Sequence, residues 1–121
     1  MTVDNPFRDE MAMTARADLL QGSLDLLILK TLDIEPLHGW GVSKRLQLLS
    51  RGALEVNQGS LYPALYRLRD RELIESDWGE SEEGRRVKVY ALTAKGRAAL
   101  EHERKGWRVF AEAVEAILAA T

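Results

Sequence analysis

Residues 59–74 read GSLYPALYRLRDRELI and place two different stripes on one predicted helix. The apolar residues recur at i, i+4 and i+7, the spacing of one face of an α-helix: Leu61, Leu65 and Leu68. A tyrosine and arginine stripe repeats this spacing one residue later and therefore lies beside the apolar face, toward solvent: Tyr62, Tyr66 and Arg69. Because phenol hydroxyls and guanidinium groups contact phosphates and guanine edges, this helix predicts nucleic acid as its first partner.

Length and composition limit the remaining possibilities. A chain of 121 residues supports one compact domain with an additional element and is too short for two full cores. No apolar run approaches the roughly 20 residues of a membrane-spanning helix, and no secretory signal is visible. Without cysteine the chain forms no disulfide, and we expect a cytoplasmic protein. The net charge of −2 gives no general support for nucleic-acid binding, so a DNA-binding surface must be a local patch.

The residues before this stretch predict two further helices and an N-terminal appendage. Residues 1–18 lack a sustained period and are predicted to form an arm or a short helix. A helical apolar stripe covers residues 24–32, and His38 with Gly39 opens a second helix. Residues 55 and 56 could add one short strand.

After residue 73 the sequence changes to a period of two, which indicates strands. Residues 74–78 and 86–92 alternate in this way, and a turn expected at 81–84 joins them as a β-hairpin. Thr93 then caps a last helix of about 25 residues, roughly 37 Å long, which is longer than a small domain can cover. Its apolar residues at spacings of seven, three, four and three predict a dimerisation seam: Leu100, Trp107, Phe110, Val114 and Ile117.

Three helices followed by a hairpin form a winged helix-turn-helix, in which the third helix enters the major groove and the hairpin contacts flanking phosphate or minor groove. The expected fold class is therefore mainly α with a small β-hairpin (α+β), completed by a long C-terminal helix. The predicted division is an N-terminal arm or short helix (1–18), a winged helix-turn-helix DNA-binding domain (19–92) and a C-terminal dimerisation helix (93–121).

Five motifs in this order resemble the PadR-like family of transcriptional regulators over about residues 19–118. They are LQGSLDLLIL at 20–29, HGW at 38–40, GSLYPALYRL at 59–68, RRVKVYALT at 85–93 and AKGR at 94–97. The resemblance implies a homodimeric, ligand-responsive repressor that binds an inverted-repeat operator. The lone helix after the hairpin looks like the short branch of the family, whose C-terminal helix dimerises with its twin. Where many relatives carry a glycine before the hairpin, this chain has Glu72, which predicts a slightly different turn.

Candidate DNA contacts lie first on the predicted third helix. Tyr62 matches the family's recognition-helix tyrosine, which implies a phosphate or base contact; partial packing under the wing is the alternative. Arg67 and Arg69 are favoured as phosphate contacts, although the interleaved Asp70 and Glu72 could pair with them along the helix. Further candidates for contacts with base edges lie in the leading turn and on the exposed side of this helix: Asn57, Gln58, Ser60 and Tyr66. Each of them could equally be a solvated polar residue. Asn57 or Ser60 could instead cap the helix.

Further candidates lie on the hairpin and on the second helix. The hairpin return resembles the family's basic wing, which implies a role on the DNA side: Arg85, Arg86 and Lys88. Glu82 and Glu83 would repel phosphate, so the tip must point partly away or these acids must pair with the arginines. His38 and Gly39 start the second helix, whose free N–H groups can hold a phosphate. Lys44 can reach the DNA backbone. The sequence is equally consistent with His38 as a loop residue that only helps to start the helix, and with Lys44 as a solvated side chain.

The tryptophans carry an open question about ligands. Small relatives can stack planar ligands between aromatic residues of two dimerisation helices, so the resemblance makes Trp107 a candidate contact for a small hydrophobic or aromatic effector. We favour packing at the dimer interface instead. Trp40 and Trp78 are expected in the core or at its rim. Two histidines, no cysteine and no glycine-rich phosphate loop provide no recognisable metal ligand set or nucleophile, so we expect no enzyme, no metal and no cofactor.

Two functions from different classes remain. One is a sequence-specific DNA-binding transcriptional regulator, a repressor that binds as a homodimer and is released by a small-molecule effector. The other is a dimeric protein-interaction module on a winged-helix scaffold without DNA binding, which the acidic balance supports. The salt dependence of DNA affinity distinguishes the two functions. Each phosphate contact makes log affinity fall with log salt by about 0.9, whereas a scaffold that does not bind DNA shows no such slope.

Overall fold

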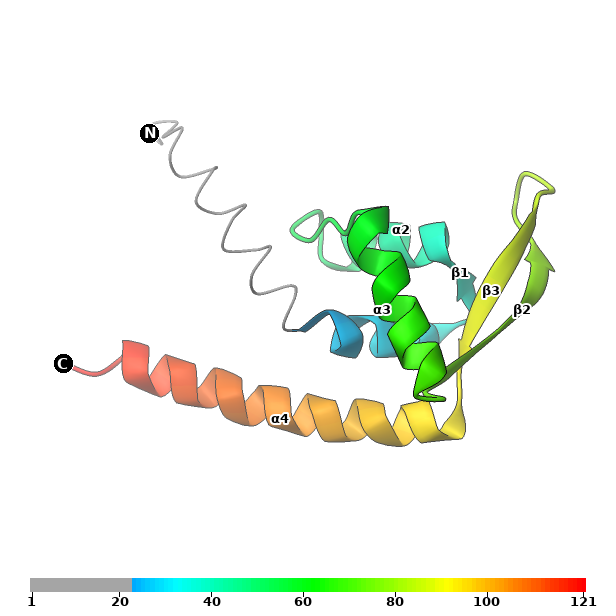
Figure 1. Ribbon diagram of the computed structural model, residues 1–121. Coiled ribbons are helices and arrows are strands. Elements are labelled where there is room, and N and C mark those ends of the chain that lie inside the picture. Colours follow the sequence, from blue (N-terminus) through cyan, green and yellow to red (C-terminus); the bar gives the residue numbers. More distant parts are fainter. Residues whose placement is uncertain (1–22) are drawn as a thin grey trace, which may run out of the picture.

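The computed structural model describes residues 23–121, and the predicted arm at residues 1–18 lies outside them (Figure 1). A helical segment at residues 23–34 is followed by the remaining elements: β1 (Leu37–His38), α2 (Gly39–Leu49), α3 (Gln58–Asp70), β2 (Ile74–Glu80), β3 (Arg86–Leu92) and α4 (Ala94–Leu118). This order of helices, wing and long helix confirms the expected fold class.

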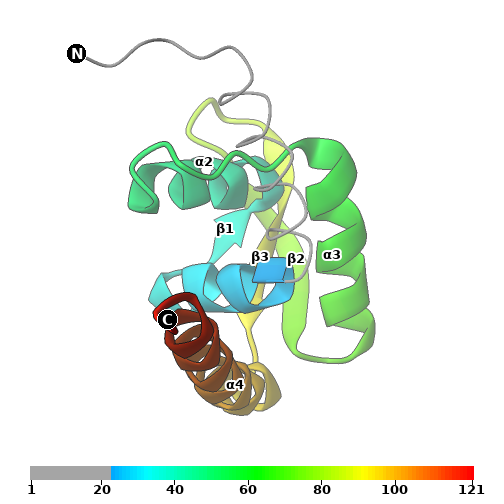
Figure 2. The ribbon, with the colours of Figure 1, turned by 90° about the vertical axis from the view of Figure 1, so that its left-hand side faces the viewer.

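The helices before the wing pack around one apolar core. In Figure 2 the segment 23–34 lies between α2 and α4, with α3 beside it. Each helix turns its apolar stripe inward, as the helical period predicts. All three helices contribute fully buried side chains, among them Ile28, Val42, Leu61, Leu65 and Leu68. The opposite face of α3 is consequently left for solvent or a partner.

The wing is a three-stranded antiparallel sheet in the order β1-β3-β2, one strand more than the predicted hairpin. β1 joins β3 through only two residue pairs, and so short a strand carries no readable period. The strand considered for residues 55 and 56 is absent. Val56 is buried there, and its carbonyl accepts a hydrogen bond from the Ser43 hydroxyl (3.2 Å), so a side chain of α2 takes the place of a strand partner.

The turn after α3 corrects the expectation at Glu72. This residue has a φ of +63°, the left-handed conformation that glycine adopts most readily, so the turn keeps the geometry a glycine would give. Several hydrogen bonds hold it; among them, the Leu73 N–H donates to the Leu68 carbonyl (3.0 Å), and the Thr93 hydroxyl donates to the Glu72 carbonyl (2.7 Å). The predicted change of turn is therefore wrong, and glutamate adopts the strained conformation.

Glu72→Gly is expected to raise the free energy of unfolding by about 1 kcal/mol, because glycine removes the clash of Cβ with the backbone at positive φ. Urea unfolding of the two proteins measures the difference. Glu72→Ala is the control, because it removes the exposed carboxylate near Lys95 but keeps Cβ, and it should bring no gain. An equal gain for alanine would show that charge, and not the backbone, causes the effect.

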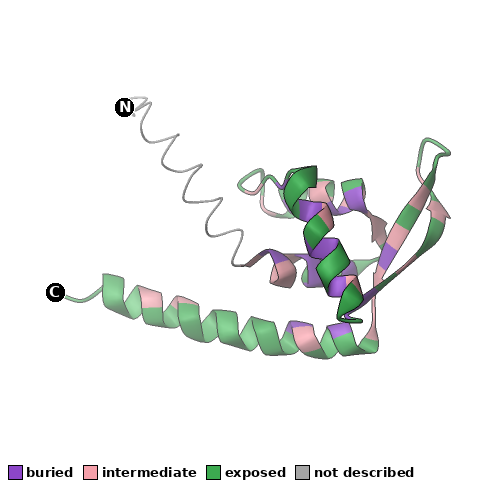
Figure 3. Cartoon of the chain, viewed as in Figure 1, coloured by how far each residue is buried: buried purple, intermediate pink, exposed green. Residues whose placement is uncertain are grey.

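α4 begins in contact with the domain and then leaves it. Thr93 caps the helix as predicted, its Oγ1 accepting from the Gly96 N–H (3.0 Å). Gly96 rests on the turn after α3, where a Cβ would collide with the Leu73 carbonyl. Leu100 is the last buried residue of α4, and beyond it the helix projects away and is mostly exposed (Figure 3). No helix among residues 23–121 is both long and apolar enough to cross a membrane.

Candidate nucleic-acid interface

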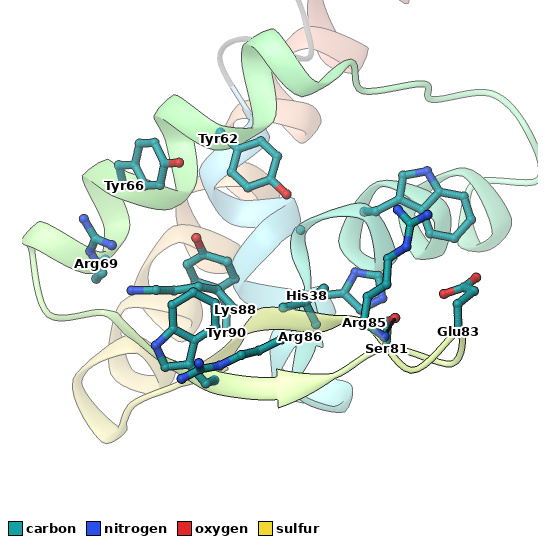
Figure 4. A pocket seen from close by; sticks show the side chains of 14 residues that line it. His38, Tyr62, Tyr66, Arg69, Ser81, Glu83, Arg85, Arg86, Lys88 and Tyr90 are labelled. Atoms are coloured by element: carbon teal, nitrogen blue, oxygen red, sulfur yellow. Dashed lines mark hydrogen bonds between the residues drawn. The ribbon is translucent and has the colours of Figure 1, made fainter.

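An open groove of about 820 Å³ lies between α3, the wing and the start of α2 (Figure 4). We call it the α3–wing groove. Although the whole chain has a net charge of −2, four cations and one carboxylate line this groove: Arg69, Arg85, Arg86, Lys88 and Glu83. Its other lining residues are mainly aromatic: His38, Gly39, Trp40, Tyr62, Tyr66, Trp78, Ser81, Val87 and Tyr90. Positive charge is therefore concentrated locally, which is what a DNA-binding surface on an acidic protein requires.

The α3 side of the groove carries the stripe that the helical spacing predicted: Tyr62, Tyr66 and Arg69 (Figure 4). The Arg69 guanidinium lies 5.2 Å from the centroid of the Tyr66 ring. Tyr62 is half-buried because its hydroxyl lies against Gly39, where an added Cβ would fall 2.6 Å from Tyr62 Cζ. Tyr62 is therefore partly packed, although against α2 and not under the wing, and its contact with DNA stays a prediction.

The start of α2 forms one end of the groove. His38 is the N-cap, and its Nδ1 accepts a hydrogen bond from the Gly41 N–H (3.1 Å). The His38 ring stacks on Trp40 with centroids 6.3 Å apart. The first turn of α2 contains no acidic residue, so no helix side chain there repels an anion at the positive end of the helix dipole.

The wing side carries a cluster that sequence reasoning missed. The Arg86 guanidinium lies 4.4 Å and the Lys88 ammonium 5.3 Å from the centroid of the Trp78 ring. Trp78, expected in the core or at its rim, is 54% exposed. The alternating pattern contained a signal for this cluster, because the strand register sets Trp78 opposite Lys88 on one face of the sheet. Within the described residues the tip acid Glu83 forms no ion pair, so it does not neutralise these cations.

The leading turn of α3 is exposed and lies outside the groove lining. Asn57 is the N-cap, and its Oδ1 accepts from the Ser60 N–H (2.8 Å), which gives Asn57 a structural role. The side chains of Gln58 and Ser60 are exposed and stay predicted base contacts.

Two predicted phosphate contacts, Arg67 and Lys44, do not line the groove. Arg67 forms an ion pair with Asp25 of the segment 23–34 (3.0 Å), and Arg71 approaches the same carboxylate (3.9 Å). Arg67 lies two residues before Arg69 and so points to another side of α3, about 200° around the helix. Arg67 is thus ion-paired, as the alternative predicted, but its partner is Asp25. Lys44 lies over the Trp40 ring, 4.8 Å from its centroid, at the rim of the groove.

Tyr90 is buried at the floor of the groove and is the second residue that the sequence did not single out. Burial raises the pKa of its hydroxyl above the ordinary value of 10.0; the nearby phenols of Tyr66 and Tyr62 add to the rise, and the Arg69 guanidinium partly offsets it. The folded protein therefore holds this proton more tightly than the unfolded chain does.

We expect stability to fall more steeply in alkali for the wild type than for Tyr90→Phe. The raised pKa of Tyr90 contributes stability that is present below the unfolded pKa of about 10 and is lost as pH rises through the folded pKa. Urea unfolding at about pH 8 and about pH 11 measures both slopes. Identical alkaline losses in the two proteins would contradict the assignment.

α4 carries a second candidate surface. Trp107 and Phe110 have ring centroids 6.1 Å apart and are 47% and 57% exposed. Val114 is partly exposed and Ile117 is 73% exposed on the same side of the helix. Leu100 differs from the other predicted seam residues, because at 3% exposure it packs in the core of its own chain. The apolar stripe of α4 therefore packs against the domain near the wing, and only its part beyond Leu100 is exposed to solvent.

A third helix beside a small antiparallel wing, with cations in the groove between them, defines a winged helix-turn-helix protein of the DNA-binding class. The model of the transcriptional regulator PadR-like family matches residues 28–102, which is more than half of the chain. The chain belongs to this family.

Solved structures and a curated relative agree with this assignment. A PadR-like transcriptional regulator from Bacillus cereus is 31% identical, over 86% of this chain and 99% of that one, with a TM-score of 0.74. A PadR family transcriptional regulator from Eggerthella lenta is 25% identical, over 97% and 100%, with a TM-score of 0.79. The transcriptional regulator Rv3488 of Mycobacterium tuberculosis is 40% identical over 68 residues, which are 56% of this chain and 63% of that protein. The protein is thus a DNA-binding transcriptional regulator and not an enzyme, as the sequence predicted.

Proposed function

We propose that this regulator is a homodimeric repressor that binds an inverted-repeat operator. The observation that carries the proposal is the cationic α3–wing groove on a chain of net charge −2. Each subunit inserts α3 into a major groove, so that Tyr62 and Arg69 contact the backbone and Gln58, Ser60 and Tyr66 meet base edges. Two half-sites then lie about one helical turn, ~10 bp, apart.

The wing and the start of α2 complete this interface in the proposal. Arg85, Arg86 and Lys88 contact phosphates that flank the major groove. Their alignment beside α3 along one groove supports this role. The capped start of α2 at His38 and Gly39, with Lys44 at the rim, holds one further phosphate. The winged helix-turn-helix of residues 19–92 is thus the DNA-binding part.

The C-terminal part, residues 93–121, is the dimerisation helix in this proposal. An apolar stripe runs along the exposed part of this helix: Trp107, Phe110, Val114 and Ile117. Exposing so much apolar surface to water is unfavourable, and a second copy of the chain that packs against the stripe would bury it. The exposed aromatic pair of Trp107 and Phe110 would also suit a small hydrophobic or aromatic effector bound between two such helices. Binding of that effector would release the operator.

Trp107→Ala is expected to raise the dimer dissociation constant at least tenfold, because buried tryptophans dominate such interfaces. Analytical ultracentrifugation over a range of concentrations measures it. The neighbouring Arg108→Ala, which lies off the apolar stripe, is the matched control and should leave the dimer unchanged. A Trp107→Ala protein that stays fully dimeric but no longer responds to its effector would assign the residue to the ligand pocket instead.

The test of the function is affinity capture of fragmented genomic DNA by the purified protein at moderate salt, followed by sequencing. Enrichment of an inverted repeat in promoter regions is the expected result. The captured repeat is then placed before a reporter gene, whose expression should fall when the regulator is present. No enrichment above bare resin by a folded, dimeric protein would reject the proposed operator-binding repressor and favour a protein-interaction module.

A further inference from the structure

Trp78 has an environment that ordinary packing does not explain. It lies on the wing with 54% of its surface exposed, although a buried indole would stabilise the fold more. Its ring instead carries two cations, the Arg86 guanidinium at 4.4 Å and the Lys88 ammonium at 5.3 Å from its centroid. All three residues line the α3–wing groove.

The geometry of the strands produces this arrangement. Trp78 on β2 is paired with Lys88 on β3, and Arg86 lies two residues from Lys88 on the same strand and so on the same face. Arginine and lysine side chains have several rotatable bonds and lose much conformational freedom when a phosphate fixes them. A cation held over an aromatic ring has already lost part of this freedom, while the edge of its guanidinium or ammonium group can still donate hydrogen bonds.

We propose that Trp78 is a positioning residue for DNA binding, which holds Arg86 and Lys88 over the groove for contact with backbone phosphates. The inference rests on the proposed function, because it requires the phosphate backbone of duplex DNA to lie along the α3–wing groove. Trp78 acts through the two cations and makes no essential contact with DNA itself.

The position of the cations argues against the other use of an exposed tryptophan. Proteins that bind single strands stack bases on aromatic rings. A base stacking on the ring face that the Arg86 guanidinium covers, 4.4 Å from the centroid, would have to displace this cation. The arrangement therefore favours a duplex backbone over an unpaired base as the partner of the wing.

A double-mutant cycle on the full-length protein tests the proposal, with the captured operator duplex as the probe. Trp78→Leu keeps an apolar side chain without the aromatic quadrupole and should weaken binding by roughly threefold to tenfold. Trp78→Phe keeps an aromatic ring and should recover most of the affinity. In a protein that already carries Arg86→Ala and Lys88→Ala, Trp78→Leu should cause no further loss.

The outcomes distinguish the inference from the function on which it rests. A loss from Trp78→Leu that persists without the two cations, or tight binding of an unstructured single strand that depends on Trp78, would overturn the positioning role but leave operator binding intact. An operator affinity unaffected by Trp78→Leu would likewise overturn the positioning role and leave operator binding intact. If the folded wild-type protein captured no duplex at all, both proposals would fail. Circular dichroism and thermal unfolding of each variant check that the protein is still folded. Should the leucine variant unfold, Trp78→Ile, which also lacks an aromatic ring and suits a strand, replaces it in the cycle.

Discussion

A protein with Arg69→Ala, Arg86→Ala and Lys88→Ala is expected to bind its operator roughly 100-fold to 1,000-fold more weakly than the wild type. The three side chains line one groove from two different elements, α3 and β3, and charge-assisted contacts to phosphate are among the stronger hydrogen bonds. The plot of log affinity against log salt should also become flatter, by about 2.7 for three lost contacts. Fluorescence anisotropy with the operator duplex at several salt concentrations measures both quantities.

The control removes the same charge from another side of the molecule. Arg67, Arg71 and Arg97 are ion-paired with Asp25 or Asp33, and none of them lines the groove. A protein with all three replaced by alanine should keep the operator affinity within about threefold and keep its salt slope. Equal losses in the two triple variants would mean that net charge, and not the groove, attracts DNA.

The second large effect is expected for Gly96→Ala, which should lower the free energy of unfolding by about 2–3 kcal/mol. A Cβ at Gly96 would overlap the Leu73 carbonyl and lie 2.7 Å from Leu92 Cδ1. The Leu92 side chain can rotate away, but the Leu73 carbonyl belongs to the backbone of the turn after α3 and cannot move aside without shifting α4. Because α4 starts directly after β3, such a shift would also disturb the wing. Thermal and urea unfolding of the variant measure the loss.

Gly41→Ala is the matched control for this substitution. Gly41 also lies in the first turn of a helix, but an added Cβ would meet its nearest neighbours, His38 and Leu37, at an ordinary 3.5 Å. Its stability should therefore stay the same or rise slightly, because alanine is the better helix former. A comparable loss at both glycines would show that the close approach at Gly96 is not the cause.

The elements were predictable because their signals are local. The apolar stripe of α3 and the alternation of β2 and β3 are read from spacing alone. The caps at Asn57 and Thr93 follow from short polar side chains just before a helical pattern. The two-residue strand β1 was missed because it is too short for a period, and Glu72 misled because its left-handed conformation is imposed by contacts with residues 68 and 93.

The groove was predictable only in part. The spacing on α3 correctly grouped Tyr62, Tyr66 and Arg69 along one side. The same spacing could have separated Arg67, which points elsewhere, but only the fold brings Asp25 to it as an ion-pair partner. Whether these residues contact DNA remains a prediction for both the sequence and the fold.

By itself the sequence determined the helices, the hairpin and the family, because periodicity, caps and motifs are properties of neighbouring residues. Tertiary structure alone decided where the cations gather, that Trp78 is exposed beneath Arg86 and Lys88, and that Leu100 is buried in its own chain while Trp107 is open. These outcomes depend on how elements distant in sequence pack against one another. A residue's face on its own element does not specify what will cover that face.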